Sequence, residues 1–377
     1  MFGVFLISAI TLMHVYIFWR ASSVPFIQRH VTGKMLVTAG LALWVLVLLG
    51  RIYGHDSPGA LVIVLGLAGM IWMAITFLIT VPMLAVDMIT VFGLALPGAA
   101  PRLRGAAIII GVLLSVIAMV QGTRQPVVQN YDVQLPGLPP KLDGTVIVGL
   151  SDLHLGSLRN ERWLDERVSQ VQAERPDIIV LLGDIFEGHG RPSKDLFLGL
   201  RGLRAPMGVW AVLGNHEFHG RDDGIVPLFR EAGIAVLRNE KAIVRQGLVL
   251  AGVDDLTSNH RSGSNTDLIT RTLTEQSSSA TVLLSHTPWN ADRAAKAKAG
   301  LMLCGHTHGG QIWPFGYLVK TVYPLLAGRY DVDGMAVIVS RGAGTWGPPM
   351  RLWLPGEIIR VTLRANKKEA LRESFGT

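Results

Sequence analysis

The stretch TVIVGLSDLHLG, residues 145–156, holds the pattern that decides the fold of the second half of the chain. A continuous apolar run, Val146–Leu150, is followed at once by Asp152 and His154. Such a run is typical of a strand that is buried on both faces, as in a parallel sheet covered by helices. We therefore expect Asp152 and His154 at the carboxyl end of a buried strand, where α/β proteins bind ligands.

The same arrangement recurs towards the carboxyl end of the chain. Further strands are predicted at Ile178–Leu182, Val209–Leu213, Leu248–Val253, Thr281–Leu284, Leu301–Leu303 and Ala336–Val339. Amphipathic stretches that predict helices lie at Glu161–Ala173, Asp195–Leu203, Ile225–Glu231, Thr266–Thr274 and Asn290–Ala299. This alternation predicts a layered α/β domain at residues 145–365, preceded by a linker and first edge segment at 122–144 and followed by a polar tail at 366–377.

Polar residues that can bind metals follow five of these apolar runs. They are Asp152-Leu153-His154, Gly183-Asp184, Gly214-Asn215-His216-Glu217, His286 and Gly305-His306-Thr307-His308. Taken singly, most have an ordinary explanation, since Gly-Asp after a strand is often a turn. His306 and His308 are more specific, because alternate residues of an extended segment share a face. All five together predict a site for two metal ions.

The residue types narrow the choice of metal. Carboxylates, one asparagine carbonyl and several imidazoles, without a thiolate, suit Mn, Fe, Zn, Ni or Co. Two cations about 3.5–4 Å apart need a bridging ligand, and Asp184 is the natural bridge because it lies between the other contributors in the chain. Cys304 is the only cysteine, so no intrachain disulfide forms, and we expect it to be a small buried core residue.

The five segments resemble the D-x-H, G-D, G-N-H-[DE], H and G-H-x-H pattern of the calcineurin-like metallophosphoesterase superfamily. The resemblance implies a four-layer αββα sandwich and two divalent metal ions. It implies that one metal takes Asp152, His154, Asp184 and His308, and that the other takes Asp184, Asn215, His286 and His306. His216 is similar to the family's catalytic histidine, which stabilises the transition state or protonates the leaving oxygen. Glu217 either orients His216 or helps to begin a helix.

The same resemblance implies hydrolysis of a phosphodiester or pyrophosphate by a metal-bridging hydroxide. Two stretches, Ser151–Gly156 and Gly305–Gln311, are similar to bacterial membrane-anchored members, which implies a lipid-linked phosphoester substrate. One alternative is an enzyme similar to the UDP-2,3-diacylglucosamine pyrophosphatase of lipid A synthesis. Another alternative, from a different class, is a non-catalytic membrane sensor that retains a structural metal site.

A late segment, Arg341–Arg351, is expected to form a loop at the rim of the site. There Arg351 is a candidate phosphate ligand and Trp346 a candidate contact for an acyl chain, although both also suit ordinary loop packing. His189 and His219 match no ligand of the family pattern, and we interpret them as rim residues.

The first half of the chain has a different character. Apolar residues make up 49% of the whole sequence and charged residues only 17%, and the apolar excess lies before residue 121. We expect a transmembrane bundle of about four helices at residues 1–121, because about 20 apolar residues suffice for one crossing. Gly59–Leu96 is long enough for either a span that ends at Pro82 followed by an interfacial helix, or a hairpin of two spans. Asp87 is correspondingly either interfacial or functional.

The charge pattern points to a lipid bilayer rather than nucleic acid. The net charge is +7, but no basic run interleaved with aromatic residues and no nucleic-acid-binding motif is present. Basic residues concentrate in the first and third predicted loops: Arg20, Arg29, Lys34, Arg102 and Arg104. With four spans these loops lie inside, which predicts a multi-pass protein of the cell membrane with an extracytoplasmic catalytic domain. With five spans the domain would lie on the other side.

Overall fold

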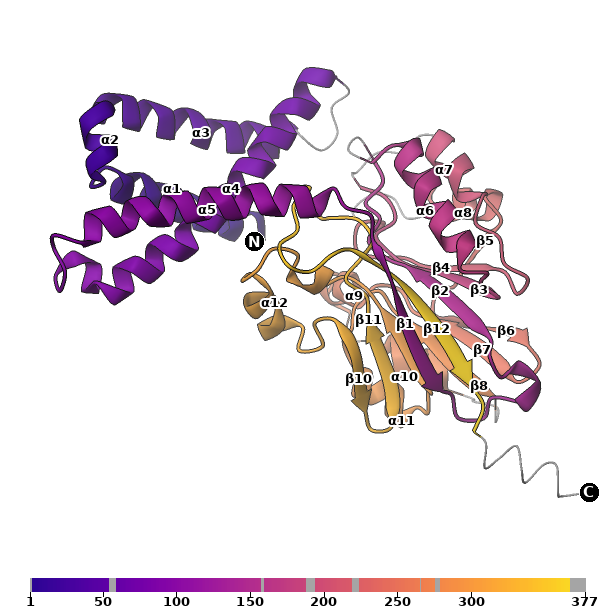
Figure 1. Cartoon of the computed structure of the whole chain (residues 1–377). Coiled ribbons are helices and arrows are strands. Elements are labelled where there is room, and N and C mark those ends of the chain that lie inside the picture. Colours follow the sequence, from indigo (N-terminus) through magenta and orange to yellow (C-terminus); the bar gives the residue numbers. More distant parts are fainter. Residues whose placement is uncertain are drawn as a thin grey trace, which may run out of the picture. The chain divides into compact units, whose positions relative to one another are not determined.

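The computed structural model of the chain (Figure 1) describes residues 2–53, 59–156, 159–187, 194–218, 224–264, 266–274 and 279–366. His189, His219 and residues 367–377, on which the sequence predictions touched, lie outside this described part. The chain divides into two compact units. Unit 1 comprises Met1–Thr123 with Gly347–Trp353, and unit 2 comprises Arg124–Trp346 with Leu354–Thr377.

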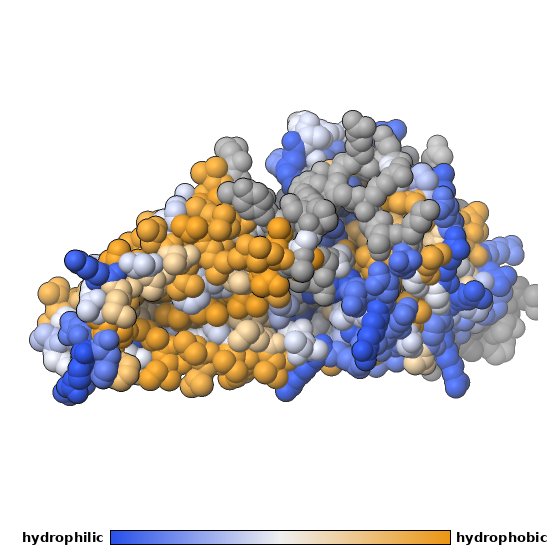
Figure 2. Space-filling model, turned by 90° about the horizontal axis from the view of Figure 1, so that it is seen from above, coloured by the Kyte–Doolittle hydropathy of each residue, from blue (hydrophilic) through white to orange (hydrophobic). Residues whose placement is uncertain are grey.

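Unit 1 is helical. Its helices are α1 (Phe2–Ala21), α2 (Pro25–His30), α3 (Gly33–Tyr53), α4 (Ala60–Ile89) and α5 (Ala100–Gly122), with a 3₁₀ turn at Val91–Gly93. Four of them, α1, α3, α4 and α5, are long and apolar enough to cross a membrane. Figure 2 shows their outer surface as mostly hydrophobic. Helices that are apolar on the outside as well as the inside are typical of a membrane domain.

Helix α4 differs from both interpretations of Gly59–Leu96. It is one continuous helix of 30 residues that contains Pro82, so Pro82 neither ends a span nor marks the turn of a hairpin. An apolar helix tolerates proline because neighbouring groups satisfy the backbone carbonyl that loses its partner. Asp87 lies in the last turn of this helix and is fully buried, with Arg20 and Arg104 as ion-pair partners.

Small residues bring the helices of unit 1 close together. A Cβ on Gly111 of α5 would lie 2.6 Å from the Cα of Ile79 in α4. A Cβ on Gly69 of α4 would lie 2.8 Å from the carbonyl oxygen of Leu46 in α3. Glycine at such contacts lets backbones approach and gain van der Waals packing, the main force between helices in lipid.

Unit 2 contains two mixed six-stranded sheets. The first has the order β1 (Val127–Gln134), β12 (Glu357–Arg364), β2 (Val146–Leu150), β3 (Ile178–Leu182), β4 (Val209–Val212) and β5 (Ile234–Val236). The second has the order β10 (Gly328–Val332), β11 (Met335–Val339), β9 (Leu301–Cys304), β8 (Ala280–Leu284), β7 (Leu248–Gly252) and β6 (Glu240–Arg245). Strands β2 to β5 run parallel, as do β7, β8, β9 and β11.

Three hydrophobic layers hold these sheets in a sandwich. Helices α6 (Glu161–Ala173), α7 (Lys194–Leu200) and α8 (Val226–Glu231) cover the first sheet through Leu164, Leu200 and Phe229. Helices α10 (Leu268–Leu273) and α11 (Ala291–Lys296) cover the second sheet. Between the sheets pack side chains such as Val180 and Leu303. The expected four-layer αββα architecture is therefore confirmed (Figure 1).

The strands expected from the sequence all appear, with bounds shifted by one residue at most. Strands β5, β6, β10 and β12 and the helices α9 (Leu256–Arg261) and α12 (Gly316–Val322) were not expected, and β1 lies in the segment 122–144 that was expected only as a linker and first edge segment. The physical reason is clearest for β1 and β6, which are largely exposed edge strands and carry many polar residues. Their hydrogen-bonding partners define them, because their own hydrophobic pattern is weak.

Candidate metal centre

The predicted ligands come from the carboxyl ends of parallel strands in both sheets. In the first sheet, Asp152 and His154 follow β2, Asp184 follows β3, and Asn215 and His216 follow β4. In the second sheet, His286 follows β8, and His306 and His308 follow β9. Parallel neighbours end at the same edge, so each sheet gathers its own ligands with no further rearrangement.

The backbone at these ligands is unusual. Asp152, His154, Asp184, His306 and His308 have φ values of 54°, 48°, 51°, 73° and 50°. A non-glycine residue in this left-handed region costs about 1 kcal/mol or more, and such strain clusters at functional sites. The surrounding strands hold the turns in place, because all of these residues directly follow buried β-structure.

Glycine precedes several ligands because the strand ends approach one another closely. A Cβ on Gly305 would lie 1.8 Å from Ser151 Oγ and 2.6 Å from Asp152 Oδ2. A Cβ on Gly214 would lie 2.2 Å from Asp184 Oδ1. Any larger residue at either position would push these carboxylates out of place.

Three predicted ligands form a first group: Asp152, His154 and His308. Their ligand atoms lie within 4.8 Å of one another. The Nε2 atoms of His154 and His308 are 3.1 Å apart, and His308 Nε2 lies 3.4 Å from Asp152 Oδ1. This group matches one of the two metal positions that the resemblance implied, apart from the bridging residue.

A second group consists of Asp184, His286 and His306, again within 4.8 Å. His286 Nε2 lies 3.2 Å from Asp184 Oδ2 and 3.1 Å from His306 Nδ1. The other nitrogen of His286, Nδ1, lies 2.7 Å from the carbonyl oxygen of Leu182. A proton on Nδ1 donates to that oxygen and leaves the lone pair of Nε2 for a cation.

Asp184 also groups with His154 and His216, so this carboxylate reaches both sides of the cluster. Beside it, Asn215 has a buried Oδ1 without a hydrogen-bond partner. A buried polar atom without a partner is rare in folded proteins. A carbonyl oxygen in this state among carboxylates and imidazoles fits a divalent cation, so the residues present suit the metals that the sequence implied.

His216 lies at the edge of this cluster and is flanked by two carboxylates. Its Nε2 is 4.0 Å from Asp184 Oδ2, and its Nδ1 is 3.4 Å from Glu187 Oε2. The backbone N–H of His216 donates to Asp184 Oδ1 at 2.8 Å. The ring therefore has a fixed place next to the proposed bridging carboxylate.

Glu187 is a residue of the site that the sequence reasoning missed. Its carboxylate contacts Nδ1 of His154 as well as Nδ1 of His216. A carboxylate on Nδ1 orients the ring and leaves Nε2 for a metal. The signal was available, since Glu187 is an acidic residue three positions after Asp184 at the end of β3.

Glu217 has a different role from either of those inferred from the sequence. Its carboxylate accepts hydrogen bonds from the backbone N–H groups of Asp184, Ile185, Phe186 and Gly214, at 2.9, 2.8, 3.2 and 2.7 Å. Glu217 thereby ties the turn after β3 to the turn after β4. Burial and the neighbouring Asp184 raise the pKa of Glu217 to about 7, although the amide bonds oppose that shift.

The electrostatics of the cluster explain why it suits cations. Burial raises the pKa of Asp152, and the charge of Asp184 adds to that effect. Burial lowers the pKa of His286, but the charge and hydrogen bond of Asp184 outweigh it and the pKa rises well above its usual value. Burial and the nearby His286 lower the pKa of His306 to about 4. The raised pKa values of Asp152 and His286 favour their protonated forms in the metal-free cluster. Binding of metal ions would displace these protons.

The two predicted substrate-binding residues belong to different units. Trp346 is in unit 2 and is 37% exposed, and its backbone N–H and C=O pair with the side chain of Gln311 at 2.9 and 3.0 Å. Arg351 is in the segment that belongs to unit 1 and is buried, and its backbone N–H donates to the carbonyl oxygen of Ala118 in α5 at 2.9 Å. The expected contacts of Arg351 with phosphate and of Trp346 with an acyl chain stay predictions.

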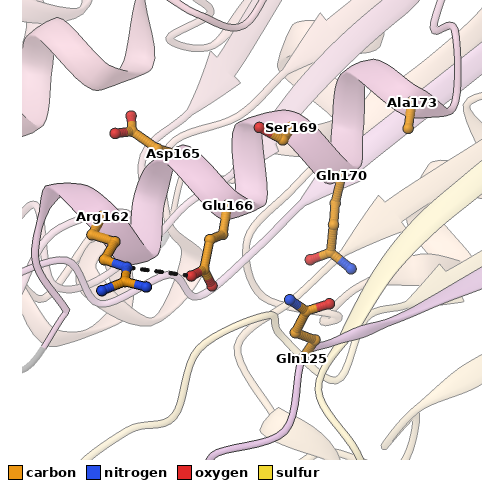
Figure 3. Close-up of a pocket in the computed structure, with 7 residues that line it drawn as sticks. All are labelled: Gln125, Arg162, Asp165, Glu166, Ser169, Gln170 and Ala173. Atoms are coloured by element: carbon orange, nitrogen blue, oxygen red, sulfur yellow. Dashed lines mark ion pairs between the residues drawn. The ribbon is translucent and has the colours of Figure 1, made fainter.

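A separate, shallow hollow lies along α6 (Figure 3). It is lined by Gln125, Arg162, Asp165, Glu166, Ser169, Gln170 and Ala173. Arg162 and Glu166 form an ion pair across one helical turn at 3.9 Å. None of the predicted ligands lines this hollow, so the chemistry belongs to the strand ends and not to this hollow.

Comparison with known proteins agrees with this class of site. Residues 145–310 match the calcineurin-like phosphoesterase family. An uncharacterized metallophosphoesterase of Aquifex aeolicus is 35% identical over 222 residues, which cover 58% of this chain and 84% of that protein. The metallophosphoesterase Cj0846 of Campylobacter jejuni is 34% identical over 227 residues, 59% of either chain.

A protein of Bos taurus named as a transmembrane protein with metallophosphoesterase domain is 33% identical over 234 residues, 58% of this chain and 53% of that one. The chain thus matches little more than half the length of two of these relatives. A solved structure of the Plasmodium inner-membrane-complex anchor GAP50 has a TM-score of 0.36 at 12% identity and covers 58% of this chain and 80% of that one, a weak likeness.

The fold and the ligand cluster are those of a metallophosphoesterase domain. The chain belongs to the calcineurin-like phosphoesterase family. Its helices α1, α3, α4 and α5 are long and apolar enough to cross a membrane, and relatives of Bos taurus and Danio rerio are named as transmembrane proteins.

Proposed function

We propose that the protein is a membrane-anchored phosphodiesterase or pyrophosphatase that uses two divalent cations and acts on a lipid-linked substrate. The observation that carries the proposal is the position of Asp184, which groups with ligands on both sides of the cluster next to the unpartnered Oδ1 of Asn215. A cluster made for one cation would not need two groups of ligands with a carboxylate in common.

Asp152, His154 and His308 would hold one cation, and Asn215, His286 and His306 the other, with Asp184 between them. When bound, the pair supplies Lewis acidity at the phosphoryl oxygens and makes water more acidic. The donor set accepts Mn, Fe, Zn, Ni or Co. The protein's own contribution is to fix these donors through the strand ends and through the carboxylates of Glu187 and Glu217.

His216 is the proposed catalytic residue. Its ring lies beside Asp184 and is oriented by Glu187, so one nitrogen is held by a carboxylate and the other is directed to the cluster. We assign to it the proton that the leaving oxygen needs when the phosphoester bond breaks, or a hydrogen bond to the phosphoryl group as charge develops.

We also propose that the protein is multi-pass and that unit 2 is extracytoplasmic. Because α4 is a single helix, the described part of the chain holds four candidate spans, and the basic residues Arg20, Arg29 and Lys34 then share a side with Arg102 and Arg104. Alkaline phosphatase and fluorescent-protein fusions after residue 125 test the side. Fluorescence without phosphatase activity would place unit 2 in the cytoplasm.

The hydrolytic proposal is tested on the full chain in detergent. The protein is stripped with a chelator, reloaded with Mn, Ni, Co or Zn in turn, and assayed on a chromogenic phosphodiester. We expect activity with at least one metal, its loss in Asp184→Asn, and its retention in the matched surface variant Asp292→Asn, because Asp292 is exposed on α11. Equal activity in Asp184→Asn and the parent, or none with any metal, would refute the proposal.

A further inference from the structure

The segment that follows the metal-site histidines presents a row of exposed apolar side chains. Tyr317, Leu318 and Val322 of helix α12 are 70%, 60% and 54% exposed. Trp313 and Phe315, just before the helix, are 46% and 40% exposed. We name these five residues the apolar lip. Single exposed apolar residues are common in soluble proteins, but five within ten positions form a patch that needs an explanation.

Close backbone packing and hydrogen bonds hold the segment that carries the apolar lip. Gly310 has a φ of 77°, and a Cβ there would lie 2.2 Å from the Cα of Gly316, so two glycines let the chain fold back on itself. The side-chain NH₂ of Gln311 donates to the backbone C=O of Trp346, and its side-chain oxygen accepts from the backbone N–H of Trp346. The N–H groups of Leu326 and Ala327 donate to Tyr330 Oη at 3.0 and 3.3 Å. The exposure is therefore a property of an ordered segment.

The charge of this segment favours an anionic surface. Between Leu301 and Gly328 the sequence holds no aspartate or glutamate, and Lys320 is its only lysine or arginine. Tryptophan and tyrosine prefer the interface of a bilayer, and a nearby lysine interacts favourably with anionic headgroups.

A bilayer is within reach because the chain carries its own anchor. Helix α5, a candidate span, ends at Gly122, and unit 2 begins at Arg124. Two residues of extended chain cover about 7 Å, so the start of unit 2 lies close to the surface that α5 leaves. A lipid surface is thus the partner always present at high local concentration.

The apolar lip is connected to the metal centre. Tyr323, directly after α12, has its Oη 2.8 Å from Nε2 of His306. Trp289 stacks on Tyr323 with ring centroids 5.4 Å apart, and its Nε1–H donates to the carbonyl oxygen of Val322 at 3.2 Å. A displacement of α12 would therefore move the Tyr323 hydroxyl that contacts His306, a predicted ligand.

We propose that the apolar lip inserts into the surface of the bilayer that anchors the chain, and so holds the metal centre at the level of lipid headgroup phosphates. The five side chains lie among the headgroups and upper acyl chains, Lys320 pairs with anionic lipid, and Tyr323 links this contact to His306. The inference rests on the membrane anchorage in the proposed function, but it does not depend on hydrolytic activity.

Spin labels on the full chain in nanodiscs of phosphatidylethanolamine and phosphatidylglycerol test the proposal. Leu318→Cys and Val322→Cys are labelled in turn, with Ile243→Cys as the matched control, because Ile243 is an apolar residue on β6 of unit 2 that is 77% exposed. The native Cys304 is fully buried, and the unmodified protein serves as its labelling control.

We expect labels at 318 and 322 to collide more often with oxygen and at least about threefold less often with a water-soluble nickel chelate than the label at 243, because oxygen concentrates in lipid. Equal access of the chelate to all three positions would overturn the proposal. Protection from both reagents at 318 and 322 would also overturn it, because protein would then cover the apolar lip.

A second variant separates lip insertion from the proposed chemistry. Leu318→Glu should move a label at 322 towards water, because a carboxylate at 318 opposes insertion among acyl chains. A label that keeps its depth would contradict the role of Leu318. Absence of hydrolysis in the parent protein would count against the proposed function alone, because the label depth is measured without turnover.

Discussion

Asp87 in unit 1 and Asp184 in unit 2 are both carboxylates buried among polar groups, and they differ in what balances their charge. In unit 1, Asp87 is fully buried and lies 2.6 Å from Arg20 Nε and 2.7 Å from Arg104 Nη2. The hydroxyl of Tyr16 donates to it at 2.8 Å, and Ser23 joins the network through Arg104. Arginine keeps its charge at any ordinary pH, so the charge of Asp87 is balanced without a metal ion.

In unit 2, Asp184 is equally buried but its partners can lose their charge. His286 and His216 lie 3.2 and 4.0 Å away, and their charges hold the pKa of Asp184 well below its usual range despite burial, which acts to raise it. A second carboxylate, Asp152, shares the cluster, and Asn215 Oδ1 has no hydrogen-bond partner. Imidazoles and carboxylates crowded in this way are stabilised by cations. The comparison separates a charge-balanced structural cluster from the candidate metal centre.

The largest expected effect is at the shared ligand. Asp184→Asn removes a negative charge that both cation positions use, so kcat/KM on a phosphodiester should fall about 10⁴-fold or more, as when one member of an interdependent catalytic unit is lost. Bound metal, measured by mass spectrometry after gel filtration, should fall with it. The thermal unfolding temperature of unit 1 should not change. A variant that keeps both metals and most of the activity would break the distinction between the two clusters.

The opposite pattern is expected at Asp87. Asp87→Asn leaves two buried arginines without their counter-charge, and breaking a buried ion pair from one side costs about 3–5 kcal/mol. Thermal unfolding in detergent should therefore begin at a clearly lower temperature, while kcat of the surviving folded protein stays within about twofold.

A double variant controls for the identity of the lost interaction. Asp87→Asn combined with Arg104→Gln removes one surplus charge, so part of the lost stability should return, because residues in contact are not additive. If the double variant is as unstable as the sum of the single variants, Asp87 and Arg104 do not stabilise each other as the structure indicates.

A smaller effect is expected at Glu187, which contacts both His154 and His216. Glu187→Gln keeps the shape but weakens the orientation of both rings, and loss of such a carboxylate typically costs about 10–100-fold in metal affinity or activity. Activity should be followed as a function of pH and metal concentration. A uniform loss that excess metal does not reverse would assign the effect to His216, and a loss reversed by metal would assign it to His154.

The affinity of the cluster for metal ions should also depend on pH. The pKa of His154 and of His286 is raised above 6.5 in the metal-free cluster, because the charges of Glu187 and Asp184 outweigh burial, which acts to lower it. Each ring must lose its proton before Nε2 binds a cation, so metal affinity should fall as pH drops through these raised values, about tenfold per pH unit for each proton. Calorimetric titration between pH 8 and 6 measures this. Affinity that is independent of pH would show that these rings are neutral before binding.

Much of unit 2 was predictable because its signals are local. The runs at β2, β3, β8 and β9 are largely apolar and buried throughout, and a predicted ligand follows each of them. Edge strands such as β1, with the pattern VVQNYDVQ, carry no such signal. β1 exists because it pairs in parallel with β12 from the far end of the chain, and no periodicity in either segment specifies that pairing.

The candidate site also has features that adjacent residues predict and features that depend on distant segments. The sequence by itself determined the types of ligand, their order and their place after strands, since these depend on residues adjacent in the chain. Only the tertiary structure decided that Glu187 contacts both His154 and His216. The same holds for Glu217, whose carboxylate joins two turns. It holds also for helix α4, which continues through Pro82 and places Asp87 between two arginines. These contacts join residues of separate segments. The periodicity of a helix or strand determines which way a side chain faces, whereas the packing of whole elements determines which residues that side chain contacts.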